Sequence, residues 1–199
     1  MLASLAFVVA AYLIGSVSFA VVTSRLFGLP DPHSYGSGNP GATNVLRTGS
    51  KAAAALTLFG DGAKGWLAVF LAQTLGPAFG VAEWTASAVA LAVFVGHLFP
   101  VFHGFAGGKG VATAAGVVIA LDWPLGLALG ALWMVMALGF KISSLAALTT
   151  AALLPLGAFY VFGNSPHAWA MVPVALLLFW RHRRNIMQLI DGKERTIGR

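Results

Sequence analysis

The sequence predicts an all-α, polytopic integral membrane protein whose helices form one bundle. Of its 199 residues, 58% are hydrophobic and only 9% are charged, whereas soluble domains carry about 25% charged residues. Apolar stretches of helical length recur along the chain and are separated by short polar connections. Neither a repeat nor a linker-like segment interrupts this pattern, so we expect residues 1–199 to form a single membrane-embedded domain.

Seven stretches are candidates for membrane-spanning helices. The first contains no charged side chain and follows no basic region, which favours a span over a cleaved signal peptide. The fourth is only about half the usual length of roughly 20 residues. In chain order, the candidates cover residues 1–24, 52–82, 84–102, 111–121, 124–140, 145–162 and 168–180.

The positions of the basic residues favour seven full crossings. The second, fourth and sixth connections contain no Lys or Arg, whereas the other three do, and the tail holds the remaining cations except Lys64. Because cytoplasmic connections are enriched in Lys and Arg, this alternation predicts an N-terminus outside and a C-terminus in the cytoplasm. A re-entrant segment at 111–121 would put Lys141 and the tail arginines on opposite sides. The basic residues of the odd connections are Arg25, Arg47, Lys51, Lys109 and Lys141.

The polar stretch 36–49, between the first two spans, is predicted to hold an anion. Its glycines allow backbone N–H groups to approach a ligand closely, because no Cβ stands in the way. Short neutral donors and one guanidinium, a planar group suited to phosphate, complete the set. A plain turn between spans is the alternative. The residues concerned are Gly36, Gly38, Gly41, Ser37, Asn39, Thr43, Asn44 and Arg47.

Two nucleotide-binding motifs are matched only in part. Residues 36–41 read G-x-G-x-x-G, but an apolar helix-length segment precedes them instead of a strand, which argues against a dinucleotide site. Residues 107–110 are like a P-loop, but His103 replaces its first glycine and Gly110 its Ser or Thr. The chain has no cysteine, so disulfides, thiolate zinc sites and a cysteinyl acyl-enzyme are excluded.

Three ionisable residues within the apolar segments have two interpretations each. Asp61 and Lys64 are three residues apart and share one helix face, so they can pair. They form either a structural ion pair or a support beneath the glycine-rich loop. His97, near the cytoplasmic end of the third span, is either a general base or a buried hydrogen-bonding residue.

The loops together resemble the PlsY family of bacterial acyl-phosphate:glycerol-3-phosphate acyltransferases. The resemblance runs from about Ser16 to Gly192, in order and with similar spacing. That family usually has an acidic residue where Arg184 stands, so only the neighbouring Asn185 is carried over. The matching blocks are GSGNPGATNVLR at 36–47, Gly60-Asp61 with Lys64-Gly65, GHLFPVF at 96–102, GGKGVAT at 107–113, SSL at 143–145 and RHRRNI at 181–186.

The resemblance implies a seven-helix enzyme of the bacterial inner membrane with its active site on the cytoplasmic face. It implies transfer of a fatty acyl group from acyl phosphate to the sn-1 hydroxyl of glycerol 3-phosphate. Lysophosphatidic acid and inorganic phosphate would be the products of this first acylation step of phospholipid synthesis. No cofactor, metal or nucleic acid is implied; the partners are the two substrates and membrane lipid, and we expect the chain to act as a monomer.

By the same resemblance, each site residue has an expected role. The glycine-rich loop would hold the acyl phosphate, and the acyl chain would lie in a groove between helices. Catalytic roles are expected for Ser37, Asn39, Thr43, Asn44, Arg47, His97 and Lys109. Substrate binding is expected for Gly36, Gly38, Gly41, Arg47, Lys109, Ser144 and Asn185, with Asp61 and Lys64 in support.

Two questions stay open at this point. An organophosphate transporter or a lipid-binding membrane protein would also suit a basic helical bundle. Transporters, however, usually bind at the membrane midplane within repeated halves, and here the polar motifs gather at one end of the predicted helices. The base that deprotonates the acceptor hydroxyl is either His97 or a phosphate of the substrates, and we favour the phosphate because it is already held beside the reacting centre.

Overall fold

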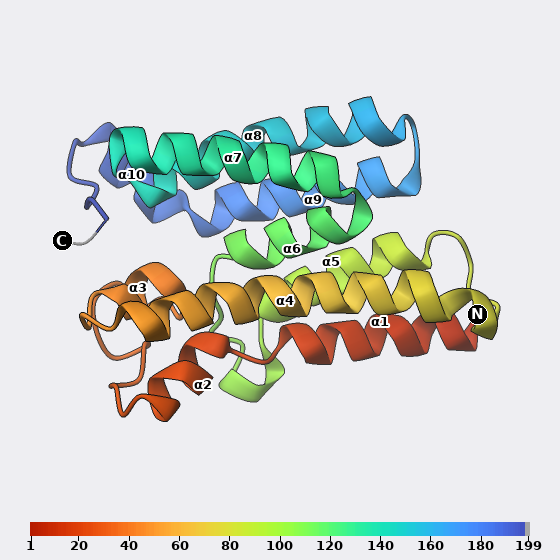
Figure 1. Ribbon diagram of the computed structural model, residues 1–199, viewed down its shortest axis with the longest axis horizontal. Coiled ribbons are helices and arrows are strands. Elements are labelled where there is room, and N and C mark those ends of the chain that lie inside the picture. Colours follow the sequence, from red (N-terminus) through yellow and green to blue (C-terminus); the bar gives the residue numbers. More distant parts are fainter. Residues whose placement is uncertain (198–199) are drawn as a thin grey trace.

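The computed structural model describes residues 1–197 and is entirely helical over that range (Figure 1). The described chain contains ten α-helices and two short 3-10 turns, with no strand. The predicted all-α class is therefore confirmed.

One layer of the bundle is built from the first half of the chain. α1 (Leu2–Gly15), α4 (Lys51–Leu75) and α5 (Thr85–Leu98) contact one another along their length. Their shared core is apolar and includes the fully buried Val93 and Phe94 of α5. This layer lies in the lower half of Figure 1.

The second half of the chain forms the other layer, with one short helix between the two. α7 (Trp123–Phe140), α8 (Ser143–Phe162) and α9 (Pro166–Arg181) contact in sequence, and α9 returns to α5. α6 (Val111–Leu121) packs against both α4 and α7 (Figure 1).

Small residues allow α6 to lie close against α4. A Cβ on Gly116 of α6 would overlap the carbonyl oxygen of Gly62, and one on Gly65 would overlap that of Thr113. Because apolar helices in lipid gain little from burying apolar surface, close backbone contact of this kind is what holds them together. α6 is thereby held directly against α4, between the two layers.

The prediction of one continuous helix over residues 1–24 is wrong. α1 ends at Gly15, and α2 (Phe19–Leu26) starts after a break with a bend of 41°. At the break, the Ser16 hydroxyl donates to the Tyr12 carbonyl at 2.9 Å, and the Ser18 hydroxyl caps α2 by accepting from the Val21 amide at 3.4 Å. Serine side chains compete with the helix for backbone hydrogen bonds, which accounts for a break that hydropathy does not reveal.

By length and composition, four helical segments within residues 1–197 can each cross a membrane alone. They are Lys51–Phe79, Thr85–His103, Trp123–Phe140 and Ser143–Phe162, and the bent α1–α2 pair would make a fifth span. α6 has 11 residues and α9 has 16, both shorter than a full span. The remaining expected boundaries agree with these helices to within a few residues.

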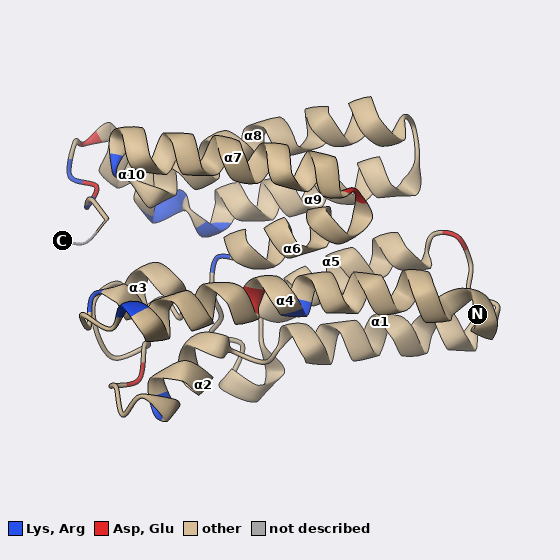
Figure 2. Cartoon of the chain, viewed as in Figure 1, with Lys and Arg blue, Asp and Glu red and all other residues tan. Residues whose placement is uncertain are grey.

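Two further helices lie in segments expected to be irregular. α3 (Ala42–Leu46) is a single turn inside the glycine-rich stretch, and α10 (Arg183–Ile190) follows α9 in the basic tail. Both lie at the same end of the bundle (Figure 1). Figure 2 shows Lys and Arg concentrated at this end, whereas the coloured segment near the N-terminus is acidic.

Candidate active site

A cavity of about 910 Å³ lies between the two layers, with residues of α6 in its wall. Polar residues from four separate segments line one part of it. Of the residues predicted for the site, only Gly38 and Lys64 are absent from its wall. Those present are Gly36, Ser37, Asn39, Gly41, Thr43, Asn44, Arg47, Asp61, His97, Lys109, Ser144 and Asn185.

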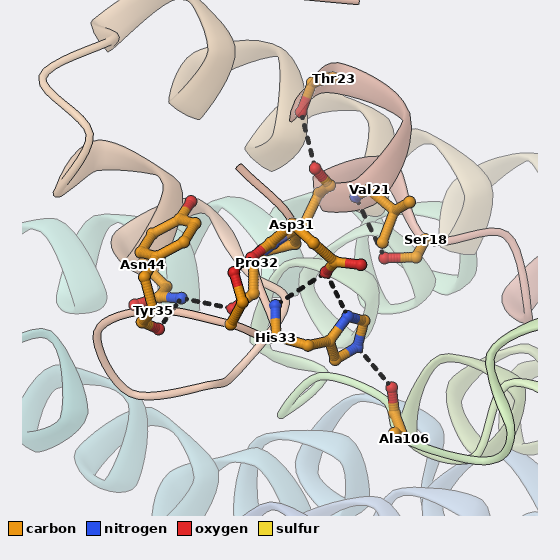
Figure 3. Close-up of polar contacts among 11 residues, drawn as sticks. Ser18, Val21, Thr23, Asp31, Pro32, His33, Tyr35, Asn44 and Ala106 are labelled. Atoms are coloured by element: carbon orange, nitrogen blue, oxygen red, sulfur yellow. Dashed lines mark hydrogen bonds and ion pairs between the residues drawn. The ribbon is translucent and has the colours of Figure 1, made fainter. Parts of the chain in front are cut away.

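Asn44 holds the glycine-rich loop together. Its side-chain oxygen accepts from the Ser37 amide and from Arg47 Nη1, both at 3.0 Å. Its amide nitrogen donates to the carbonyls of Pro32 at 2.9 Å and Tyr35 at 3.2 Å (Figure 3). With every hydrogen-bonding site of the amide used, Asn44 shapes the loop and orients Arg47 and has no donor left for a ligand.

Gly36 and Gly38 of this loop both have positive φ angles, but only Gly36 lines the cavity. Gly36 has φ +60°, and a Cβ there would overlap the Asn44 side-chain oxygen. Gly38 has φ +65° and lies outside the cavity wall, so it serves the turn and the structure gives it no contact with the cavity.

The second loop, between α5 and α6, is held by contacts from Arg181 and His33. Arg181, the last residue of α9, donates through Nε to the Gly108 carbonyl at 3.0 Å and through Nη2 to the Gly107 carbonyl. His33 Nε2 lies 3.0 Å from the Ala106 carbonyl, while its Nδ1 contacts Asp31 at 2.7 Å (Figure 3). His33 thus ties the second loop to the glycine-rich one.

Lys109 begins a chain of polar contacts between residues that line the cavity. Its Nζ donates to Asn185 Oδ1 at 2.6 Å, and Asn185 Nδ2 donates to Glu194 Oε1 at 2.8 Å. The same glutamate oxygen accepts from the Ser144 hydroxyl at 2.9 Å. The chain joins the second loop, α10, the tail and the start of α8.

Burial lowers the pKa of Lys109 to about 8, with Arg47 and Arg181 adding to the reduction and Glu194 opposing it. Arg47 and Lys109 both line the cavity, and Arg181 binds the loop carbonyls directly before Lys109. Such a cavity attracts an anion strongly, because bringing in negative charge relieves the repulsion among these cations.

His182 is buried, although it lies in the basic segment 181–186. The residue is only 3% exposed, lines the cavity, and its Nδ1 lies 2.8 Å from the Leu178 carbonyl. Burial, with the nearby Lys109, lowers its pKa to about 4, so it is neutral at physiological pH.

The predicted pairing of Asp61 with Lys64 is confirmed, and it extends further. Their charged atoms are 2.9 Å apart, both side chains are at least 95% buried, and His97 Nδ1 lies 3.5 Å from the same carboxylate oxygen. Lys64 also donates to the Val17 carbonyl at 2.7 Å, inside the break between α1 and α2. The cluster of Asp61, Lys64 and His97 therefore joins α4, α5 and the α1–α2 break next to the cavity.

The other face of His97 is covered by the second loop. The Gly108 amide donates to the His97 carbonyl at 3.2 Å, and a Cβ on Gly108 would overlap His97 Nε2. His97 therefore stands between Asp61 and the backbone next to Lys109, which is a position suited to supporting the loop.

Another part of the cavity wall is mostly apolar. It comes mainly from α4, α6, α7 and α8, and the α4 and α7 side chains Phe59 and Met134 are 74% and 52% exposed. An alkyl chain would fit this part while its polar head faced Arg47 and Lys109. Further apolar lining residues include Leu58, Trp66, Val118, Ile119, Leu129, Trp133 and Leu154.

Sequence reasoning missed two residues of this site. Arg181 belongs to the matching block at 181–186 but is given no role there, although its position at the end of a span, next to Trp180, is a usable signal. Glu194 has no local signal beyond being an acidic residue in a basic segment, since only the folded tail brings it to Asn185 and Ser144. Among residues 1–197, no three His, Asp or Glu side chains lie close enough to hold a metal ion.

Known proteins match the whole chain. A family model described as glycerol-3-phosphate acyltransferase matches residues 5–192. The glycerol-3-phosphate acyltransferase of Cupriavidus pinatubonensis is 61% identical over 199 residues, which cover 99% of this chain and 98% of that protein. The corresponding protein of Neisseria meningitidis is 54% identical over 191 residues, or 96% of each chain.

Two crystal structures of PlsY (YgiH), an integral membrane glycerol 3-phosphate acyltransferase, have the same fold. The glycerol 3-phosphate form gives a TM-score of 0.89 at 37% identity and covers 98% of this chain and 96% of that one. The lysophosphatidic acid form gives 0.87 at 36% identity, covering 97% and 94%.

Proposed function

Since this chain belongs to the glycerol-3-phosphate acyltransferase family, we propose that it takes its acyl group from acyl phosphate and delivers it to the sn-1 hydroxyl. The resemblance noted in the loops is confirmed at the level of the family. The proposed donor and acceptor are supported by one observation. A cationic part of the cavity, rich in hydrogen-bond donors, is continuous with an apolar part. We propose that residues 1–199 act as one domain and as a monomer.

The two phosphates would occupy neighbouring positions in the cationic part. Arg47, Lys109, Ser144 and Asn185 would bind glycerol 3-phosphate, and the glycine-rich loop would hold the head of the acyl phosphate. The acceptor oxygen then bonds to the acyl carbon, the bond from that carbon to the phosphate oxygen breaks, and inorganic phosphate leaves. Acyl phosphate is an activated mixed anhydride, so holding the reactants and stabilising charge can supply most of the catalysis without a protein nucleophile.

The proton of the acceptor hydroxyl would pass to a substrate phosphate. Phosphate monoesters have a second pKa near 6, so the dianion can accept it at neutral pH. His97 is enclosed by Asp61 on one side and by the Gly108 backbone on the other, which supports a positioning role for it.

His97→Gln tests the choice of base. A general base typically contributes about 10²–10⁴-fold to the rate. We expect a smaller loss, expressed mainly as a higher KM for glycerol 3-phosphate, because the second loop would lose its support. A kcat reduced by 10² or more, with an unchanged KM and an intact fold, would identify His97 as the base.

The activity should weaken at alkaline pH in a way that Lys109 controls. With a pKa of about 8, Lys109 is an ammonium below that pH and increasingly a neutral amine above it, so affinity for a phosphate dianion should fall as pH rises. Lys109→Arg should remove this alkaline fall, since a guanidinium stays charged, even if its altered shape lowers the absolute rate. Profiles of kcat/KM against pH for both proteins, corrected with enzyme-free blanks, make the comparison. The same alkaline fall in both would exclude Lys109 as its source.

The concentration of Lys and Arg at the α3–α10 end supports a seven-span arrangement with that end in the cytoplasm of the bacterial inner membrane (Figure 2). The active site would then lie at the cytoplasmic face, with N-terminus outside and C-terminus inside. α6 and α9 would cross in addition to the longer segments.

Single cysteines test this topology, since the chain has none of its own. Ala82→Cys and Asn164→Cys should react with an impermeant maleimide in intact cells. Lys51→Cys and Lys193→Cys should react only after the cells are opened. Labelling of Lys193→Cys from outside would overturn the arrangement.

The direct test of the proposed function uses purified protein, acyl phosphate and glycerol 3-phosphate. The expected products are phosphate and lysophosphatidic acid in equal amounts, with the acyl chain at sn-1. Absence of both products, from protein shown to be folded, would refute the proposal.

A further inference from the structure

Glu194 lies among the residues assigned to the acceptor, and neither the sequence motifs nor the proposed reaction uses it. It follows α10 in the tail, where the amides of Lys193 and Glu194 donate to the Gln188 carbonyl at 2.7 and 3.1 Å. Three residues later, the Ile197 amide donates to the Lys141 carbonyl at the α7–α8 junction, at 2.7 Å. The tail is therefore held at both ends, and the Glu194 side chain lines the cavity.

The carboxylate determines how its two neighbours can face a ligand. Oε1 accepts from both the Ser144 hydroxyl and Asn185 Nδ2. Because the amide nitrogen of Asn185 is committed to Glu194, its Oδ1 faces Lys109. One N–H of Asn185 and the lone pairs of the Ser144 oxygen remain for the ligand.

The negative charge of Glu194 acts on the ammonium of Lys109. Oε2 of Glu194 is buried and has no hydrogen-bond partner among residues 1–197. Three other charged or titratable residues act on Lys109 or are acted on by it: Arg47 after α3, and Arg181 and the neutral His182 at the end of α9. Arg195 also lines the cavity. Glu194 is the one carboxylate that acts on Lys109, and Asn185 links the two through hydrogen bonds.

We propose that Glu194 is a positioning residue that aligns Asn185 and Ser144 for the acceptor and supplies the counter-charge for Lys109. The inference rests on the proposed function in that the acceptor is glycerol 3-phosphate. It adds a residue to the subsite and explains why a cavity lined by Arg47 and Lys109 also contains the half-buried carboxylate of Glu194.

Glu194→Gln separates charge from shape. The KM for glycerol 3-phosphate should rise roughly fivefold to tenfold, because hydrogen bonds to a neutral amide oxygen are weaker than those to a carboxylate. The alkaline fall in kcat/KM should move to lower pH by about one unit, because the substitution removes the opposite charge that raises the pKa of Lys109. Glu83→Gln, at an exposed residue outside the cavity wall, is the matched control and should change neither quantity.

A chemical measurement of Lys109 makes the test independent of enzymatic activity. Acetic anhydride labels only the neutral amine, so the extent of Lys109 acetylation against pH, read by mass spectrometry, reports its ionisation directly. The midpoint should lie near pH 8 in the original protein and about one unit lower in Glu194→Gln. If acyl transfer were absent but this shift were present, the proposed function would fail while the pairing of Glu194 with Lys109 would stand.

Three outcomes would overturn the inference. A lower KM in Glu194→Gln would mean that the carboxylate competes with the substrate phosphate for Ser144 and Asn185. An unchanged labelling midpoint would mean that Lys109 does not depend on its charge. If Glu194→Gln does not fold, Glu194→Asp replaces it: the shorter carboxylate should keep the midpoint near that of the original protein yet raise the KM, and an unchanged KM would contradict the proposal.

Discussion

Arg47→Lys is expected to lower kcat/KM for glycerol 3-phosphate by about 100-fold or more. Removing one partner of a desolvated charge pair typically costs about 2–5 kcal/mol. Asn44 holds Arg47 through Nη1 at 3.0 Å, which leaves the other edge of the guanidinium for the ligand. A lysine ammonium is a point charge and cannot make the two parallel hydrogen bonds of a guanidinium to phosphate.

The loss should appear mainly as a raised KM for glycerol 3-phosphate, measured with acyl phosphate at saturation. Arg25→Lys is the matched control, because Arg25 is exposed, precedes the same loop and lies outside the cavity wall. It should behave as the original protein does. Unaltered kinetics in Arg47→Ala would remove Arg47 from the site.

The second large effect is expected from Asp61→Ala, which should lower the free energy of unfolding by about 3–5 kcal/mol. The substitution leaves the Lys64 ammonium buried without its carboxylate and removes the contact to His97. Most proteins have only about 5–15 kcal/mol of stability, so this loss is a large share of the total. Thermal unfolding of the purified protein in detergent would measure it.

Removing both charges together distinguishes a buried pair from a catalytic carboxylate. Asp61→Leu combined with Lys64→Met should recover part of the lost stability, because apolar pairs often replace buried ion pairs well. Asp191→Ala is the control: its ion pair with Lys193 is exposed, so stability should not change measurably. If Asp61→Ala is as stable as the original protein but inactive, Asp61 takes part in the chemistry.

The helices could be predicted from the sequence because hydropathy and the position of positive charge decide where they lie. Segment 111–121 is the clearest case, since α6 has the predicted bounds. The break at residues 16–18 could not be predicted, because it depends on serine hydroxyls and on Lys64 reaching the Val17 carbonyl from another helix. Nothing in the local pattern of the first 24 residues records that contact.

The sequence predicted many of the residues that line the site, but not which of them hold the loops and which face the cavity. The motifs identified Arg47, Lys109, Ser144 and Asn185, and the structure brings all four to one cavity. They did not reveal that Asn44 uses its whole amide on the protein, because its partners lie in the loop conformation itself. Glu194 reaches the site through a tail that is held by the Gln188 carbonyl and by a long-range hydrogen bond from the Ile197 amide to the Lys141 carbonyl.

A comparison of acyl donors tests whether the protein takes its acyl group from acyl phosphate. Purified protein is given glycerol 3-phosphate with acyl phosphate, or with acyl-CoA of the same chain length, and lysophosphatidic acid and free phosphate are both measured. We expect lysophosphatidic acid only with acyl phosphate, accompanied by one phosphate for each acyl group transferred. Lysophosphatidic acid formed equally well from acyl-CoA, or formed from acyl phosphate without release of phosphate, would contradict this expectation.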